Sequence, residues 1–156
     1  MAVLMDDIKK LRDLTNAGMM DCKNSLEKTN GNIEEALKIL REKGLADAKK
    51  RSDRETKEGG VYIKKDNNKI AVALIGCETD FVARNEIFIE AKDKILDKIL
   101  EMQNEDIDLY NEIIQDAISR IKENIELKKI KYLEIKDNEY SSIYIHGNNK
   151  IGVGSA

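Results

Sequence analysis

The stretch VYIKKDNNKIAVALI, residues 61–75, decides the fold class of this chain. Its two ends, residues 61–64 and 70–75, are rich in β-branched and aromatic residues and have the period of two that is typical of strands. Between them lies DNNK, residues 66–69, a polar segment typical of the tight turn in a β-hairpin. The sequence therefore predicts two antiparallel strands joined by a short turn.

The same pattern returns at the end of the chain. Residues 143–153, IYIHGNNKIGV, repeat the pattern of residues 61–72, and the shared NNKI segments lie 81 residues apart. The tyrosines of the two copies are 82 residues apart, one more than the NNKI segments, which predicts that the two turns differ in length by one residue. A repeated hairpin indicates a duplicated α+β unit whose second copy stops at its second strand. Chance similarity between two hairpins is the alternative.

Residues 1–45 carry three short apolar stripes at helical spacing. Asn32 precedes the third stripe as an N-cap, Glu35 completes a capping box, and Gly44 is well placed to end the helix. Because such narrow stripes are not stable alone, we expect them to pack into a compact three-helix domain. The stripes consist of Leu4, Ile8, Leu11, Leu14, Met19, Cys22, Leu26, Ile33, Ala36, Leu37 and Leu40.

Residues 46–60 contain almost no large apolar side chain and end in two glycines, which predicts a charged linker. Five basic residues lie between positions 49 and 57, and four acidic residues nearly cancel their charge. Two interpretations follow, a solvated connector or an RNA-binding patch.

Two amphipathic helices are predicted after the hairpin, one with its apolar stripe at 88–102 and the next at 110–125. A segment rich in β-forming residues at 127–135 predicts a further strand. The fold class is therefore expected to be α+β. The predicted divisions are a three-helix head at 1–45, a linker at 46–60, a first core subdomain at 61–135, and the first hairpin of an incomplete second subdomain at 136–156.

The chain has 156 residues and a formal net charge of −3, from 27 Lys and Arg against 30 Asp and Glu. This balance does not favour a basic nucleic-acid-binding domain. No apolar run approaches the roughly 18–20 residues of a membrane-spanning helix, and the start lacks the basic segment of a signal peptide. With only Cys22 and Cys77, no disulfide framework is expected, and a reducing, cytoplasmic location is the simplest prediction.

Catalytic groups do not come together in this sequence. A nucleophile needs a base beside it, and the single histidine, His146, is expected to be exposed in the turn of the second hairpin. Cys22 and Cys77 fall at apolar positions and are assigned to the core. Since the sequence has no phosphate-binding glycine loop and no metal-ligand spacing, we expect a protein that is not an enzyme and needs no cofactor or metal. A hydrolase would require a reactive thiol at Cys77.

Two features indicate a binding surface instead. Met19 and Met20 are neighbours on a predicted helix and point about 100° apart, so one of them faces solvent or a partner unless both fold beneath the preceding turn. Phe81 follows Thr79 and Asp80 between a strand and a helix. It is either an exposed aromatic wedge or a plug over a helix that Thr79 or Asp80 caps.

Three segments resemble the elongation factor Ts family of bacteria and organelles. They are LRDLTNAGMMDCK at 11–23, CETDFVARN at 77–85 and, more weakly, HGNNKIGV at 146–153. The two stronger segments are long and stand in the family's order and separation. The resemblance implies a head similar to ubiquitin-associated domains, followed by two related α+β core subdomains.

The resemblance also implies a function, that of a nucleotide exchange factor. Such a factor binds elongation factor Tu carrying GDP and disturbs the magnesium and phosphate site, so that GDP leaves and GTP can be loaded. The head grips a helix of the partner, and a tip pushes between partner helices. By motif match, the partner-binding residues are Lys9, Arg12, Met19, Met20 and Lys23 in the head, Thr79, Asp80, Phe81 and Val82 at the tip, and Ile121 and His146.

Two residues depart from the family pattern, in which glycine is usual at both positions. Lys122 follows the predicted contact Ile121, and Asn16 occupies a turn, where asparagine tolerates unusual backbone angles. Short family members form dimers, so a homodimer is left open. The competing hypothesis is a non-catalytic scaffold that binds RNA or protein through the head and the basic linker, although the net charge makes nucleic acid the weaker partner.

Overall fold

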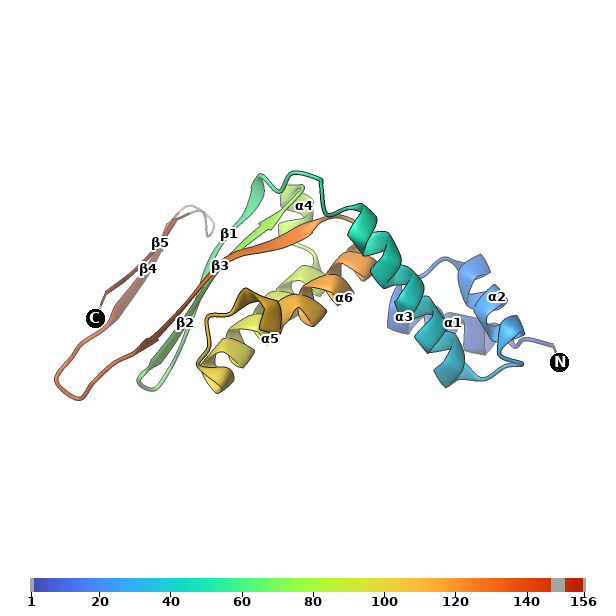
Figure 1. The fold of residues 1–156 in the computed structure, drawn as a ribbon, viewed down its shortest axis with the longest axis horizontal. Coiled ribbons are helices and arrows are strands. Elements are labelled where there is room, and N and C mark those ends of the chain that lie inside the picture. The colour runs from blue at the N-terminus through green and yellow to red at the C-terminus, as the bar shows by residue number, and fades with distance from the viewer. Residues whose placement is uncertain (1, 147–150, 156) are drawn as a thin grey trace.

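The computed structural model describes residues 2–146 and 151–155. The fold is α+β, with helices first and antiparallel strands after them, as the sequence predicts. Figure 1 shows three parts in a row: a helical head, a sheet covered by helices, and a separate hairpin. The elements are α1 (Met5–Thr15), α2 (Met19–Lys28), α3 (Ile33–Lys50), β1 (Glu58–Asp66), β2 (Lys69–Cys77), α4 (Asp80–Ala83), α5 (Glu86–Met102), the 3-10 helix η1 (Ile107–Tyr110), α6 (Asn111–Ile121), β3 (Ile125–Glu134), β4 (Ser142–His146) and β5 (Ile151–Ser155).

The head has its own small core. The predicted N-cap is confirmed, because the side chain of Asn32 accepts hydrogen bonds from the backbone N–H of Glu34 at 3.1 Å and of Glu35 at 3.3 Å. Leu4 and Leu14, predicted to join the apolar stripe of α1, are exposed instead. The buried apolar residues of the head are Ile8, Leu11, Cys22, Leu26, Ala36 and Leu40.

Gly44 does not end its helix, contrary to the prediction. The helix α3 continues through Gly44 to Lys50 and packs against α6. A Cβ atom at Gly44 would lie 2.8 Å from Cβ of Ser119, closer than side chains pack. The glycine therefore permits a close approach of two helices, a tertiary demand that local helix-stop signals do not reveal. Because α3 extends to Lys50, the connection between α3 and β1 is only residues 51–57, shorter than the predicted linker at 46–60. The division into domains remains a prediction.

The first predicted hairpin is confirmed. β1 and β2 pair antiparallel up to Asp66 and Lys69, and Asn67 in the two-residue turn has a positive φ of 52°. β3 confirms the predicted third strand and pairs with the other side of β2. Ile125 starts this strand, whereas the sequence placed it on the second helical stripe. The helix α6 already ends at Ile121, because Lys122 turns into the left-handed conformation.

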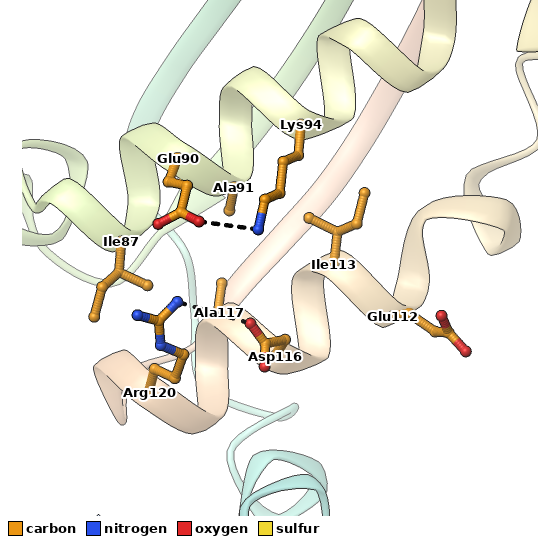
Figure 2. A pocket seen from close by; sticks show the side chains of 9 residues that line it. All are labelled: Ile87, Glu90, Ala91, Lys94, Glu112, Ile113, Asp116, Ala117 and Arg120. Atoms are coloured by element: carbon orange, nitrogen blue, oxygen red, sulfur yellow. Dashed lines mark ion pairs between the residues drawn. The ribbon is translucent and has the colours of Figure 1, made fainter. Parts of the chain in front are cut away.

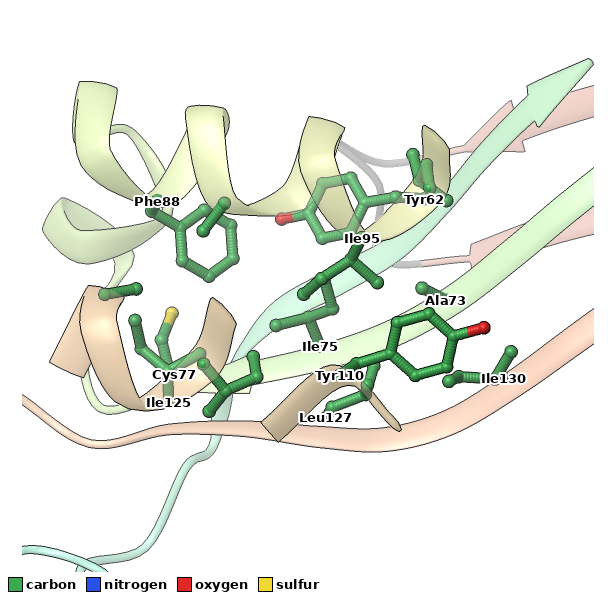
Figure 3. Packing of buried hydrophobic residues seen from close by; sticks show 14 of the residues in the cluster. Tyr62, Ala73, Ile75, Cys77, Phe88, Ile95, Tyr110, Ile125, Leu127 and Ile130 are labelled. Atoms are coloured by element: carbon green, nitrogen blue, oxygen red, sulfur yellow. The ribbon is translucent and has the colours of Figure 1, made fainter. Parts of the chain in front are cut away.

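One face of the sheet is covered by α5 and α6, and the space between holds the main core (Figure 3). Tyr62 of β1 and Phe88 of α5 meet edge to face, with ring centroids 5.9 Å apart. Tyr110, from η1, is fully buried and its hydroxyl donates to the carbonyl of Asn104 at 2.6 Å. Met102, the last residue of the predicted α5 stripe, is exposed. This core fixes the position of the loop that leaves β2.

The second predicted hairpin is also confirmed, as the antiparallel pair β4–β5. Its pairing repeats that of the first hairpin with a constant offset of 81 residues, so that Ile143 takes the place of Tyr62. Tyr144 is therefore not the structural counterpart of Tyr62, contrary to the alignment of the two tyrosines. His146 is the last residue of β4 and pairs with Ile151, rather than lying in the turn. Its side chain lies outside the described part of the structure.

Candidate functional site

A short loop and a one-turn helix form the tip that follows β2. The strand ends at the buried Cys77, whose thiol donates to the carbonyl of Thr79 at 3.2 Å. Of the two predicted capping residues, Thr79 is the one used: its hydroxyl accepts a hydrogen bond from the backbone N–H of Val82 at 3.4 Å. The cap starts α4, which packs beside β1 and β2.

Phe81 is the exposed group of this tip. Its side chain is 77% exposed, so the interpretation of Phe81 as a plug over the helix start is wrong. Val82, the next residue, is only 2% exposed and belongs to the main core. Of the four predicted tip residues, Val82 therefore anchors α4 and cannot offer its side chain to a partner in this conformation. Asp80 is exposed and forms a long ion pair of 3.8 Å with Arg84, a surface contact of little energetic value.

The predicted head contacts are all exposed. Met19 and Met20 are 44% and 65% exposed, so both face solvent and the alternative in which both fold beneath the turn is wrong. Lys9 and Arg12 of α1 and Lys23 of α2 are also exposed. Three further exposed apolar residues on or beside α1, which sequence reasoning did not assign to a surface, are Leu4, Met5 and Leu14. Methionine adapts its shape to a partner, which suits an interface.

The predicted contact Ile121 is only partly available. It packs against the main core as a partly buried residue. Lys122 follows in the left-handed conformation with φ 66°, and its N–H donates to the carbonyl of Ile118 at 2.7 Å. This is the C-cap position at which glycine is favoured, since a Cβ atom is strained there. The geometry gives a physical reason for the glycine that the family pattern implies.

These predicted contacts lie on separate surfaces of the molecule. The head helices α1 and α2 lie at one end of α3, and the tip α4 lies beyond its other end, beside the sheet (Figure 1). Glu78, at the base of the tip, was not assigned a role from the sequence although it is part of the CETDFVARN segment. Its carboxylate accepts a hydrogen bond from the backbone N–H of Asn124 at 2.7 Å.

The groove between α5 and α6, of about 200 Å³, is a weaker candidate (Figure 2). Four of its five charged side chains pair with one another, Glu90 with Lys94 at 2.9 Å and Arg120 with Asp116 at 3.9 Å. Among the residues that the structure describes, no group of three or more His, Cys, Asp or Glu could hold a metal ion. None of the described helices is long and apolar enough to cross a bilayer.

Neither cysteine has the setting of a reactive thiol. Cys22 and Cys77 are both buried and take part in no disulfide. Burial, the largest cause, raises the pKa of the Cys22 thiol above its ordinary value. Because reactive cysteines are partly exposed and have lowered pKa values, the hydrolase hypothesis finds no support at either position.

Comparison with known proteins identifies the family of this chain. A family model described as elongation factor TS matches residues 78–155, half of the chain. Elongation factor Ts of Aquifex aeolicus is 44% identical and covers 98% of this chain. The proteins of the same name from Borreliella burgdorferi strain ZS7 and Treponema denticola are 43% and 40% identical, covering 94% and 98%. The chain spans 59%, 53% and 55% of the length of these three relatives. The chain belongs to the elongation factor Ts family.

Proposed function

We propose that this chain binds elongation factor Tu carrying GDP and accelerates the release of GDP. The observation that carries the proposal is the position of Phe81, an aromatic side chain that is 77% exposed on the short helix α4, which the Thr79 cap and the buried Val82 hold in place. Family membership supplies the partner, because the relatives carry the name elongation factor Ts. The exposed methionines of the head supply a second surface for the same partner.

The mechanism is a coupling of free energies between two binding events. The head holds the partner, and the tip places Phe81 between partner helices beside the bound Mg²⁺ and phosphates. Because Mg²⁺ requires near-ideal octahedral geometry at short distances, a small displacement of its ligands weakens the bound nucleotide strongly. The coupling is reciprocal: if the factor weakens GDP binding, GDP weakens binding of the factor by the same ratio.

Each tip residue has a distinct part in this mechanism. Phe81 supplies rigid apolar volume, and its full burial in a partner is worth about 1.5–3 kcal/mol. Thr79 caps the helix and Val82 anchors it to the core. Asp80 presents an exposed carboxylate to the partner. No covalent bond is made or broken in this process, so the residues act as an exchange factor and not as an enzyme. We propose that this activity takes place in the cytoplasm, together with translation.

A scaffold that binds RNA through the basic linker is less well supported. Three of the five basic residues between positions 49 and 57 already form ion pairs with acidic residues. Lys50 pairs with Asp47 at 3.6 Å, Lys57 with Glu55 at 3.0 Å, and Arg54 with Glu78 at 3.5 Å. These exposed pairs are weak, but they show that the local charge is balanced. Salt-dependent RNA binding without any effect on GDP release would favour the scaffold.

The test measures release of a fluorescent GDP analogue from elongation factor Tu after addition of this chain and excess GTP. The chain is expected to accelerate release, and Phe81→Ala to lower the maximal rate at least tenfold with an unchanged circular dichroism spectrum. Tyr140→Ala is the matched control, because Tyr140 is an even more exposed aromatic side chain outside the tip. Equal rates for Phe81→Ala and the unchanged chain would refute the role of the tip.

A further inference from the structure

Three chain segments meet behind the tip, at Glu78, Asn124 and Arg54. The backbone N–H of Asn124 donates to Oε1 of Glu78 at 2.7 Å. The side-chain amide of Asn124 donates to the carbonyl of Arg54 at 2.7 Å. The guanidinium of Arg54 returns to the same Oε1 of Glu78 at 3.5 Å. We call these three residues the tip bracket.

The hydrogen bonds of the tip bracket are shielded from water. Asn124 is 5% exposed, and the side chain of Glu78 is 18% exposed. A buried N–H that loses its acceptor is costly, whereas the half-exposed Arg54 contributes only a screened ion pair. The bond between Asn124 and Glu78 is therefore the strong link, and the ion pair is secondary.

Each segment in the tip bracket leads to a different predicted partner contact. Glu78 directly precedes Thr79 and the exposed Phe81. Asn124 lies in the turn after α6, three residues beyond Ile121. Arg54 lies in the connection from α3 to β1, and α3 belongs to the head (Figure 1). The bracket therefore joins the base of the tip to two of the other regions that are predicted to touch the partner, the head and the end of α6.

We propose that Glu78 is a positioning residue for nucleotide exchange, which holds the base of the tip so that Phe81 enters the partner in a fixed direction. This inference rests on the proposed function. β2 fixes the chain only as far as Cys77, and Val82 is the next residue anchored in the core. Between them, the carboxylate of Glu78 is the side chain that ties the loop to another part of the molecule.

A positioning role differs from a purely stabilising role in what it changes. The head of a Glu78 variant still binds the partner, so the concentration of chain that gives half-maximal release is expected to stay within threefold. A tip that enters in variable directions displaces the nucleotide site less often, so the maximal rate is expected to fall at least tenfold. A general loss of stability would lower the active fraction and leave the rate per folded molecule unchanged.

The experiment titrates the chain against elongation factor Tu loaded with a fluorescent GDP analogue and compares Glu78→Ala, Glu78→Gln and Glu126→Ala. Glutamine keeps an oxygen that can accept from Asn124, so Glu78→Gln is expected to retain at least a third of the maximal rate. Glu126→Ala is the matched control. Its carboxylate accepts from the buried Thr56 hydroxyl at 2.9 Å, so its loss also frees the α3–β1 connection but leaves the tip untouched.

Circular dichroism and thermal unfolding accompany each titration. If Glu78→Ala does not fold, Glu78→Asp is used in its place. Aspartate keeps the negative charge, but its side chain is one methylene shorter, so its carboxylate lies further from the backbone N–H of Asn124. Equal maximal rates for Glu78→Ala and Glu126→Ala, or an effect of Glu78→Ala on half-saturation alone, would overturn this inference. A maximal rate for Glu78→Gln as low as that for Glu78→Ala would also overturn it. If the unchanged chain does not accelerate release, both the inference and the proposed function fail.

Discussion

Replacing Lys122 with glycine is expected to stabilise the protein. Lys122 has φ 66° at the C-cap of α6, and a left-handed backbone costs a residue with a Cβ atom about 1–2 kcal/mol. Glycine removes that strain, but it has more conformational freedom in the unfolded chain. This freedom lowers the stability of the folded chain by roughly 0.5–1 kcal/mol. The net gain is about 0.5–1 kcal/mol. The backbone bond from residue 122 to Ile118 is kept, and the lysine side chain is exposed and forms no ion pair with any residue that the structure describes.

Thermal unfolding followed by circular dichroism measures this gain. For a chain of this size, a change of 1 kcal/mol moves Tm by about 2–4 °C, so a gain of about 0.5–1 kcal/mol for Lys122→Gly is expected to raise Tm by roughly 1–4 °C. Gln103→Gly is the matched variant. Gln103 ends α5 with φ 54°, and its N–H donates to Ile99 at 2.8 Å, so its replacement is expected to raise Tm by a similar amount.

Asn16→Gly provides the contrast that tests the reasoning. Asn16 also ends its helix in the left-handed conformation, with φ 55°, but asparagine adopts it at lower cost. Its side-chain amide donates to the carbonyl of Arg120 at 2.6 Å and ties the head to α6. Loss of that bond costs about 0.5–1.5 kcal/mol, so Tm is expected to fall. A rise in Tm for Asn16→Gly equal to that for Lys122→Gly, or no rise for Lys122→Gly, would refute the strain argument.

Two further changes test the packing and the core. Gly44→Ala is expected to lower Tm although alanine is the better helix former by about 1 kcal/mol, because the added Cβ would meet Cβ of Ser119 at 2.8 Å; a higher Tm would contradict the close approach. Burial raises the pKa of Tyr62 to about 12, so the unfolded chain loses this proton near pH 10 and the folded chain only near pH 12. Up to about 3 kcal/mol of stability is therefore expected to disappear between these pH values, and Tyr62→Phe, followed by urea unfolding, should lack this part of the loss.

Local patterns were sufficient for the elements whose signals are local. The hairpin at 61–75 has two β-rich segments around a turn that needs a positive φ, and Asn67 supplies it. The cap at Asn32 depends only on the three residues that follow it. Both could be predicted because no distant part of the chain is needed to decide them.

Other features depend on tertiary contacts and could not be derived locally. Gly44 has the signature of a helix end, but its neighbour Ser119 lies 75 positions along the chain, and that contact explains the glycine. The exposure of Phe81 depends on how α4 packs beside the sheet. The sequence alone therefore could not decide whether Phe81 is an exposed wedge or a plug over the helix start. Asn124 carries no sequence signal, because its role comes from the backbone N–H and from two distant carbonyl groups.

A rigid base is a physical requirement for a tip of this kind. The four residues of α4 are too few to be stable as an isolated helix, and fixing a flexible backbone costs about 1–2 kcal/mol per residue. If α4 became ordered only on binding, that cost would be about 4–8 kcal/mol, against the roughly 1.5–3 kcal/mol gained by burying Phe81. For a flexible wedge, the free energy spent on ordering α4 would exceed the free energy gained by burying Phe81. Such a wedge could not displace the helices of a partner. In this structure α4 is already ordered in the folded chain, by the Thr79 cap, the buried Val82 and the bond between Glu78 and Asn124. The conformational entropy of α4 is therefore lost during folding and not on binding. The free energy gained by burying Phe81 can then displace the helices of the partner.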